Sequence, residues 1–234
     1  MKNKSVVVFS GAGMSAESGL STFRDSGGLW EKYRIEEVAT PEAWYSNKNR
    51  VLEFYNMRFN QLSEVEPNEA HRIIANMEGE FDISVITQNV DNLHERAGSK
   101  KVLHLHGELA KCKSEGNPDY IIDMPEKGLN LGMTCPDGHQ LRPNVVWFGE
   151  AVPNMVPAAE LIANCDALII VGTSLNVYPA AGLAYSAPEE SITVLVDPGD
   201  FDAHMITNIE HIKKPATKGI EQAFEKVKNY LVNE

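Results

Sequence analysis

The hydrophobic positions of this 234-residue chain gather in short continuous runs, and stretches of helical periodicity separate them. A continuous apolar run is typical of a strand covered on both faces, as in a parallel sheet packed between helices. We interpret five runs as strands, at residues 6–9, 83–87, 102–105, 167–171 and 192–196. Their alternation with helices predicts an α/β fold with a doubly wound, Rossmann-like parallel sheet.

Helix signals fill the gaps between these runs. Thr40 and Pro41 are typical of a helix start, because threonine caps the first turn and proline fits its first position. Further helices are predicted in "PNEAHRIIANME" from residue 67, in "PAAGLAYSA" from residue 179 and in "KGIEQAFEKVKNYL" from residue 218.

Two stretches break this alternation. Residues 29–66 are mostly helical in pattern, and residues 111–143 are polar, irregular and rich in Gly and Pro. We expect the two to pack together as a small inserted module. The predicted organisation is therefore a Rossmann-like domain of residues 1–28, 67–110 and 144–234 with an inserted module of residues 29–66 and 111–143.

Composition restricts the partners and the location. The chain has 33 acidic and 21 basic side chains and a formal net charge of −12, which disfavours binding to nucleic acid or to an anionic membrane. No apolar run approaches the length of a membrane helix, and three cysteines make no disulfide framework. We expect a cytoplasmic protein with no nucleic-acid and no membrane partner.

A glycine loop follows the first predicted strand. Gly11, Gly13 and Ala16 fit the G-x-G-x-x-[GA] spacing of dinucleotide-binding loops, although a structural turn explains this spacing nearly as well. No strand ending in an acid follows about 20 residues later, which argues against an ordinary dehydrogenase. The loop continues through Phe23 and Arg24 and is interpreted as a lid over a ligand.

A second ligand-binding edge is predicted in the C-terminal half. The strand at residues 167–171 leads into Gly172, Thr173 and Ser174, and the strand at residues 192–196 leads into Asp197. A carboxylate at the carboxyl end of a strand can hold ribose hydroxyls. Asp197 can equally cap the turn "DPGD", and both interpretations stay open.

Neutral hydrogen-bonding residues are concentrated after the strand at residues 83–87. Gln88, Asn89 and Asp91 follow it directly, where open α/β sheets bind ligands. In "LHLHGEL" we interpret His106 as a general base facing the crevice. We interpret His104 and the earlier His94 as structural.

These motifs together resemble a known family. The blocks "GAGMSAESGLSTFRD", "TQNVDNLHERAG", "HLHGEL", "LRPNVVWFGE" and "VGTSLNVYP" stand in the order and at the spacing of the sirtuins, the NAD-dependent protein lysine deacylases. The resemblance implies NAD as a consumed co-substrate and acylated lysines of proteins or peptides as partners. It implies catalytic roles for His106 as general base and for Asn89 and Asp91. The positions that it places around NAD are Gly11, Ala12, Gly13, Ser15, Phe23, Arg24, Gln88, Asn89, Asp91, Gly172, Thr173, Ser174 and Asp197, the last where many sirtuins have asparagine.

The resemblance also implies a reaction and a substrate path. The acyl oxygen attacks the ribose carbon as nicotinamide leaves, and His106 helps a ribose hydroxyl to lose its proton. The products are nicotinamide, free lysine and O-acyl-ADP-ribose. The acyl-lysine peptide adds as a strand between two of the quoted blocks. Its implied contacts are Tyr55, Arg58, Val146, Trp147, Phe148, Gly149 and Val177.

Tyr55 and Arg58 indicate the acyl group. They lie three residues apart on a predicted helix, and the pair is similar to the one that marks sirtuins acting on acidic acyl groups. Arginine offers two parallel donors to a succinyl or malonyl carboxylate. The alternative is a surface arginine whose stem covers apolar residues. We expect desuccinylase and demalonylase activity, with deacetylation also possible.

The chain departs from the family at the zinc module, where sirtuins commonly have two C-x-x-C pairs. Here Cys112 is followed by Glu115 in the second position of its pair, and Cys135 by Gly138. A structural zinc site needs four ligands. With only Cys112 and Cys135 remaining, loss of zinc is favoured over a site rebuilt with His139.

Three other classes compete with a deacylase. A nucleotide-dependent oxidoreductase is disfavoured by the absent early acid, and a non-catalytic ADP-ribose-binding module by the presence of His106. A protein mono-ADP-ribosyltransferase, the third class, would use the same NAD pocket, as would a simple deacetylase, which is an alternative within the deacylases.

Overall fold

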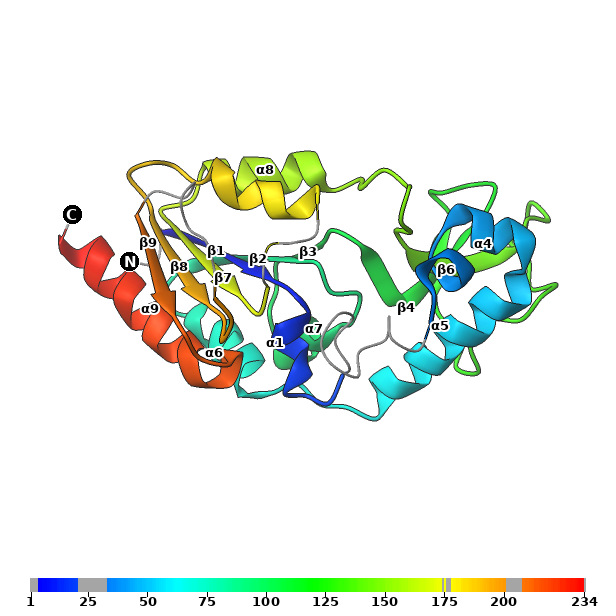
Figure 1. The fold of residues 1–234 in the computed structure, drawn as a ribbon, viewed down its shortest axis with the longest axis horizontal. Helices are drawn as coiled ribbons and strands as arrows, with labels where there is room; N and C mark the ends of the chain where they lie inside the picture. Colours follow the sequence, from blue (N-terminus) through cyan, green and yellow to red (C-terminus); the bar gives the residue numbers. More distant parts are fainter. Residues whose placement is uncertain (1–3, 21–32, 174, 176–177, 201–207, 234) are drawn as a thin grey trace.

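The computed structural model describes residues 4–20, 33–173, 175, 178–200 and 208–233. Figure 1 shows a large unit built on a parallel sheet and, at the opposite end of the molecule, a small unit of helices and short strands. Phe23, Arg24, Ser174 and Val177, which were predicted to contact NAD or peptide, lie outside the described residues.

The large unit contains a six-stranded sheet in the order β3-β2-β1-β7-β8-β9, with every neighbouring pair parallel. The strands are β1 (Ser5–Ser10), β2 (Asp82–Thr87), β3 (Val102–His104), β7 (Ala167–Val171), β8 (Ile192–Val196) and β9 (Ile209–Ile212). This topology confirms the predicted Rossmann-like α/β fold. The five predicted strands form, and β9 is an addition that the sequence pattern did not indicate.

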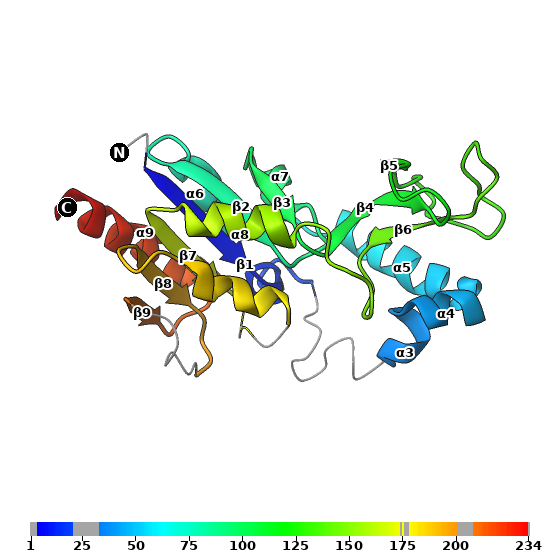
Figure 2. The ribbon, with the colours of Figure 1, turned by 90° about the horizontal axis from the view of Figure 1, so that it is seen from above.

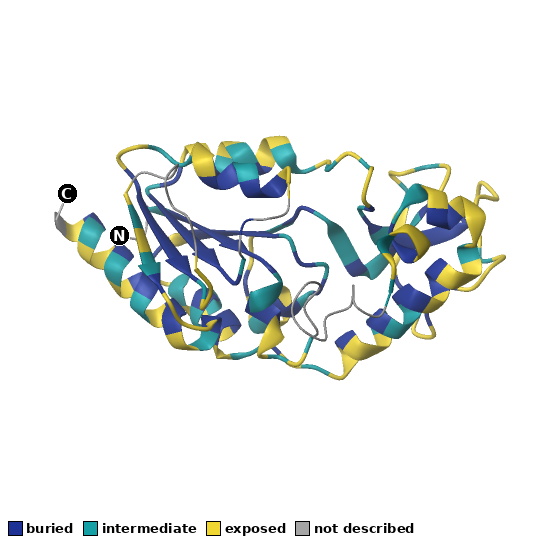
Figure 3. Cartoon of the chain, in the orientation of Figure 1, coloured by how far each residue is buried: buried dark blue, intermediate teal, exposed yellow. Residues whose placement is uncertain are grey.

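Helices cover both faces of this sheet, as Figures 1 and 2 show. Val6 and Val8 point to a core shared with α6 (Glu69–Met77) and α9 (Ala216–Asn233). Val7 and Phe9 point to a second core shared with α8 (Met155–Ala163) and η1 (Ala180–Ser186). Burial on both sides explains the continuous apolar runs, and Figure 3 shows the central strands of this sheet in the colour of buried residues.

The strand order reverses between β1 and β7. The chain moves from β1 outward to β2 and β3, and later from β7 outward to β8 and β9. The loops after β1 and β7 therefore diverge from adjacent strands at the carboxyl edge, which is where open α/β sheets bind their ligands. Both predicted glycine loops lie at this reversal point.

The small unit combines helices with a three-stranded antiparallel sheet, ordered β5-β4-β6. Its elements are α3 (Ile35–Val38), α4 (Pro41–Ser46), α5 (Lys48–Ser63), β4 (Gly107–Ser114), β5 (Ile121–Asp123) and β6 (Leu141–Val145). The Thr40 side chain accepts a hydrogen bond from the Ala43 N–H, which confirms the predicted cap of α4. Trp44 and Phe54 are buried in a core shared with residues of β4 and β6.

Three sequence expectations need correction. The stretch 111–143 is not wholly irregular, because β4 and β6 pair across it, and these strands cross the predicted boundaries at residues 110/111 and 143/144. The segment "PAAGLAYSA" forms a 3₁₀ helix. Helix α8 was not predicted. Strands of a small antiparallel sheet need partners only on one face, so their apolar signal is weak.

Among the described residues, no helix has both the length and the apolar character needed to cross a bilayer.

Candidate active site

The loops that follow β1 and β7 touch backbone to backbone. The Gly11 N–H donates to the Val171 carbonyl at 3.1 Å, and the Gly13 N–H to the Gly172 carbonyl at 2.8 Å. A Cβ on Gly13 would lie 2.9 Å from the Gly172 Cα. Glycine is therefore required here by the contact between the two loops, before any ligand is considered.

The polar residues after β2 connect these loops to a third. The Asn89 carboxamide donates to the Gly11 carbonyl at 3.0 Å and to the Ser15 hydroxyl at 3.1 Å. The Gln88 carboxamide donates to the Thr173 hydroxyl at 3.2 Å. The predicted NAD positions after β1, β2 and β7 are thus brought together, and part of the polar surplus serves to hold the three loops in place.

Asp91 is a buried carboxyl group at the start of the segment leading into α7 (Leu93–Ala97). Its Oδ1 accepts from the Leu93 N–H at 3.2 Å. Burial raises the pKa of Asp91, and hydrogen bonds from Ser15 and Leu93 counter part of that rise. A raised pKa at a buried carboxyl in a ligand-binding edge is typical of a functional site.

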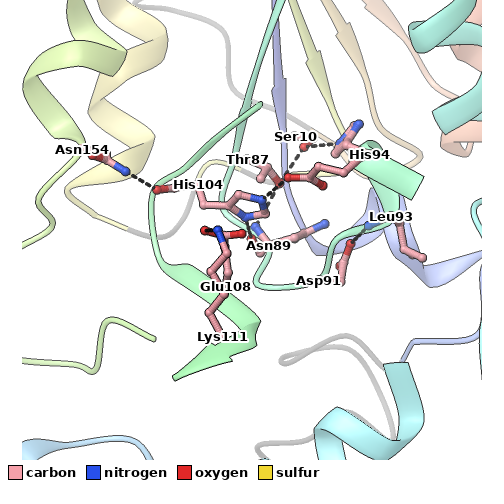
Figure 4. A network of polar contacts seen from close by, with 11 residues as sticks. Ser10, Thr87, Asn89, Asp91, Leu93, His94, His104, Glu108, Lys111 and Asn154 are labelled. Carbon is pink, nitrogen blue, oxygen red and sulfur yellow. Dashed lines mark hydrogen bonds and ion pairs between the residues drawn. The ribbon is translucent and has the colours of Figure 1, made fainter. Parts of the chain in front are cut away.

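His104 and His106 bond to neighbouring carbonyls of the same loop. The His106 Nδ1 lies 2.8 Å from the Gln88 carbonyl oxygen, and the His104 Nδ1 lies 2.9 Å from that of Asn89, as drawn in part in Figure 4. Because a carbonyl only accepts, each Nδ1 carries a proton. Burial lowers the pKa of His106, so its ring is neutral with a lone pair at Nε2. This is the protonation state that a general base needs.

The two histidines interpreted as structural are buried and bond to protein groups. The His104 Nε2 lies 2.8 Å from the Glu95 carboxylate, and the His94 Nε2 lies 3.0 Å from the Ser10 hydroxyl, while the His94 Nδ1 has no hydrogen-bond partner among the described residues. These contacts agree with the structural interpretation, which stays a prediction. Strand β3 ends at His104, so His106 belongs to the connection into β4.

Tyr55 and Arg58 face the same site from α5. Arg58 is only 8% exposed, which rules out the alternative of a surface arginine. Burial lowers its pKa, while the nearby Tyr55 and Asp91 favour its charged form, so the pair lies within electrostatic reach of Asp91 in the large unit. Burial raises the pKa of Tyr55 to about 12, so its hydroxyl stays protonated at neutral pH.

The segment after β6 lines up beside His106. The Val146 N–H donates to the His106 carbonyl at 2.9 Å. Trp147 is buried against Trp44, with ring centroids 5.6 Å apart, whereas the Phe148 side chain is 43% exposed. Gly149 has a φ of +93°, a conformation that favours glycine. The contact of these four residues with the acyl-lysine peptide stays a prediction.

The residues that hold the Trp147 ring in place were not predicted from the sequence. The Arg142 guanidinium carbon lies 3.3 Å from the Trp147 ring centroid, and both its amino groups bond to the Glu150 carboxylate. Arg142 and Glu150 stand in a quoted block, but no local signal indicates that an arginine covers an aromatic ring five residues later.

Asp197 caps its turn. Its Oδ1 accepts from the Gly199 N–H at 2.8 Å, as the turn interpretation predicts. Asp197 lies at the carboxyl end of β8 and is half-buried. Its predicted contact with ribose remains a prediction, as does that of Thr173, which already accepts from Gln88.

Three candidate ligands of the predicted zinc module bond to other protein groups. The Cys112 thiol donates to the Asp123 carbonyl and the Cys135 thiol to the Ser114 hydroxyl. The Glu115 carboxylate accepts from the Trp44 Nε1 at 2.8 Å and from Lys48 at 2.6 Å. Among the described residues, they do not gather with His139 into a group of three metal ligands.

Over the part of the chain that the structure describes, one group of side chains could offer three metal ligands within 4.8 Å of one another: Glu95, His104 and Glu108. Each already has a protein partner, since Glu95 bonds to His104 and Glu108 to Lys111. We therefore treat the group as a hydrogen-bonded network.

Residues 11–179 match the model of the Sir2 family. The chain belongs to the Sir2 family. An NAD-dependent protein deacylase of Bacteroides thetaiotaomicron is 51% identical to this sirtuin over 224 residues, covering 94% of this chain and 96% of that protein. An NAD-dependent protein deacylase of Helicobacter pylori is 48% identical over 224 residues, covering 96% and 97%.

Solved structures agree with the sequence match. A Sir2 homologue in complex with ADP-ribose superposes on this sirtuin with a TM-score of 0.87 at 33% identity, covering 99% of this chain and 94% of that one. A Sir2 homologue in complex with NAD gives a TM-score of 0.84 at 34% identity, covering 97% and 91%. The family resemblance inferred from five sequence blocks is confirmed.

Proposed function

We propose that this sirtuin is an NAD-dependent protein deacylase that removes acidic acyl groups, succinyl and malonyl, from lysine side chains. The observation that supports this preference is the burial of Arg58 beside Tyr55 on α5, within electrostatic reach of Asp91. The five N–H donors of its guanidinium can serve protein contacts and a substrate carboxylate together. An acetyl group brings no carboxylate to this position.

The residues present fit NAD as the co-substrate. The first turn of α1 (Ala12–Ala16) carries no acidic side chain that would repel a pyrophosphate, and the glycine loops after β1 and β7 meet at the reversal point of the sheet. The co-substrate supplies an ADP-ribosyl group with nicotinamide as its leaving group. The proposed NAD positions are those around Gly11, Gly13 and Gly172.

His106 is the proposed general base. Its Nδ1 is held by the Gln88 carbonyl, so the free lone pair is at Nε2, and its lowered pKa keeps the ring neutral. The ring can therefore accept a proton from a ribose hydroxyl while the acyl group moves to the sugar. Asn89 and the Asp91 carboxyl supply polar groups beside the ribose carbon, which becomes electron-poor as nicotinamide leaves. One water molecule is consumed as the lysine is released, and the products are nicotinamide, unmodified lysine and O-acyl-ADP-ribose.

The deciding experiment compares acyl groups on one peptide. Purified protein is incubated with NAD and a succinyl-, malonyl- or acetyl-lysine peptide, and the products are identified by mass spectrometry. Arg58→Met is expected to lower kcat/KM for the two acidic substrates by about 100-fold, because loss of a charge-assisted partner costs a few kcal/mol. The acetyl peptide is expected to change little.

Arg50→Met is the matched control, since Arg50 lies on the same helix and its side chain is about half exposed beside Glu37. It is expected to leave all three rates near the wild-type values. Equal losses for acidic and acetyl substrates in Arg58→Met would refute the acyl preference.

We further propose that the small unit folds without zinc. The hydrogen bonds of Cys112, Cys135 and Glu115 to other protein groups support this. The cytoplasmic location and the absence of nucleic-acid and membrane partners rest on composition and stay predictions.

A further inference from the structure

Two consecutive peptide carbonyls after β2 each hold one histidine. The Gln88 carbonyl accepts from His106 and the Asn89 carbonyl from His104, at 2.8 and 2.9 Å. These carbonyls belong to two successive peptides joined at the Asn89 Cα, so the main-chain conformation at Asn89 relates the positions of the two rings. The same segment also carries the Asn89 carboxamide, which bonds to Gly11 and Ser15.

His104 is held at three points. Its Nδ1 bonds to Asn89, its Nε2 lies 2.8 Å from Glu95 on α7, and its main-chain carbonyl accepts from the Asn154 carboxamide at 2.7 Å (Figure 4). Its side chain is buried, with 7% of the residue exposed. A carbonyl and a carboxylate both only accept, so both ring nitrogens carry protons and the ring is cationic.

The surroundings support this charge state. Burial by itself lowers the pKa of His104, and the hydrogen bond and charge of Glu95 more than offset it, with further help from Asn89 and Glu108. Burial by itself raises the pKa of Glu95. The hydrogen bond and charge of His104 act in the opposite direction, and the pKa of Glu95 is lowered overall. The shifts of both pKa values therefore favour the ionised pair that the hydrogen bonds indicate.

We propose that His104 is a positioning residue whose hydrogen bond to the Asn89 carbonyl fixes the main chain at Asn89 and thereby orients the adjacent Gln88 carbonyl on which His106 rests, with Glu95 supporting the ring from its other side. This inference rests on the proposed function for its kinetic consequence. Both ring nitrogens and the main-chain carbonyl of His104 have protein partners, so its effect on the reaction passes through the main chain around Asn89. Without the bond to the Asn89 carbonyl, the main chain on either side of the Asn89 Cα can rotate and weaken the bond that holds His106.

Two substitutions of His104 separate positioning from general stability. The amide nitrogen of His104→Asn stands close to the place of Nδ1, so this variant keeps the bond to Asn89 and loses Glu95. The amide nitrogen of His104→Gln stands close to the place of Nε2, so this variant keeps Glu95 and loses Asn89. Glu95→Gln keeps a hydrogen bond to His104 and removes the charge.

The kinetic readout is kcat for the best acyl-lysine peptide with NAD, together with both KM values. His104→Gln is expected to lower kcat by about tenfold or more with the peptide KM little changed, because small misplacement of a catalytic group is costly. His104→Asn is expected to retain most of kcat. Glu80→Gln, which removes a surface ion pair with Lys228, is the control and is expected to retain full kcat.

A second readout does not depend on activity. The ring of His106 is titrated by NMR, with its signal assigned from its loss in His106→Ala. The bond from Gln88 raises the pKa of His106, so its weakening in His104→Gln is expected to lower that pKa, and His104→Asn is expected to match the wild type.

The outcomes are distinguishable. If the wild-type protein acts on none of the acyl peptides but the titration shifts as expected, the proposed function fails and the positioning role stands. If the two His104 variants lose kcat equally and in proportion to their melting temperatures, or if neither moves the His106 titration, His104 is merely structural and the proposal is overturned.

Discussion

His104 and His106 have the same side chain and the same kind of hydrogen bond to neighbouring carbonyls, yet their pKa values move in opposite directions. The difference lies at the second ring nitrogen. Glu95 occupies that position at His104, whereas for His106 burial dominates and only the Gln88 bond counters it. A single carboxylate thus decides which histidine is cationic and which can accept a proton.

The lowered pKa of His106 predicts the acid side of the pH profile. The neutral ring is the active form, and a pKa below the usual 6.5 keeps it neutral at pH 6.5 and above. We expect kcat/KM for the acyl peptide to be retained down to pH 6.5 and to fall only at lower pH. The measurement is kcat/KM from pH 5 to 9.

His106→Ala is the companion variant, and it is expected to lose turnover at every pH. An acid limb centred above pH 6.5 in the wild type would mean that another group, or a His106 with a raised pKa, controls the rate.

At the scale of elements, the site depends on the contact between the β1–α1 loop and the loop after β7. Gly172 has a φ of +61°, where L side chains are rarely found. A Cβ there would lie 2.2 Å from the Met14 nitrogen and 2.5 Å from the Gly13 carbonyl carbon. The two loops can meet only because this position has no side chain.

Gly172→Ala is therefore expected to separate the loops. The left-handed conformation and the backbone clash together should lower the free energy of unfolding by at least about 2 kcal/mol. NAD affinity is expected to fall as well, because the pyrophosphate positions after β1 shift. Denaturant unfolding and NAD titration measure the two effects.

Gly182→Ala is the matched control, because an added Cβ there meets no atom within 4 Å and its φ is not positive. It is expected to change stability by no more than about 0.5 kcal/mol. Similar losses in the two variants would show that the Gly172 contact is not required.

At the scale of the whole molecule, the small unit is held by hydrogen bonds and a hydrophobic core. Gln140 is buried and receives the Gly132 N–H at its Oε1, while its Nε2 lies within 3.1 Å of the carbonyls of Asn130, Met133 and Leu141. One side chain thus joins the middle of the segment between β5 and β6 to the start of β6. The core around Trp44 and Cys112 packs beneath it.

We predict that the stability of a module held in this way does not depend on chelators. We expect elemental analysis of the purified protein to find zinc well below one atom per chain, and the melting temperature to be unchanged by EDTA. Gln140→Ala, by contrast, should lower the free energy of unfolding by about 1–3 kcal/mol, because it removes several hydrogen bonds made by one buried side chain. Stoichiometric zinc and a lower melting temperature in EDTA would contradict the proposal.

The sequence by itself determined the class of fold, the ends of most strands and the family. Continuous apolar runs such as Val6–Val8 and the capped start at Thr40 are local signals, and each reports burial or hydrogen bonding within a few residues. Parallel strands in one sheet also have a common carboxyl edge, so the residues after β1, β2 and β7 were predicted to meet.

Only the tertiary structure decided what depends on partners far along the chain. Three features depend on contacts that no local periodicity indicates. They are the burial of Arg58, the ion pair of His104 with Glu95, and the pairing of β4 with β6. The physical reason is that desolvation and hydrogen-bond partners set charge state and exposure, and these are properties of the folded surroundings. For the same reason the hydrogen bond from the Gly199 N–H to Asp197 became visible only in the folded chain.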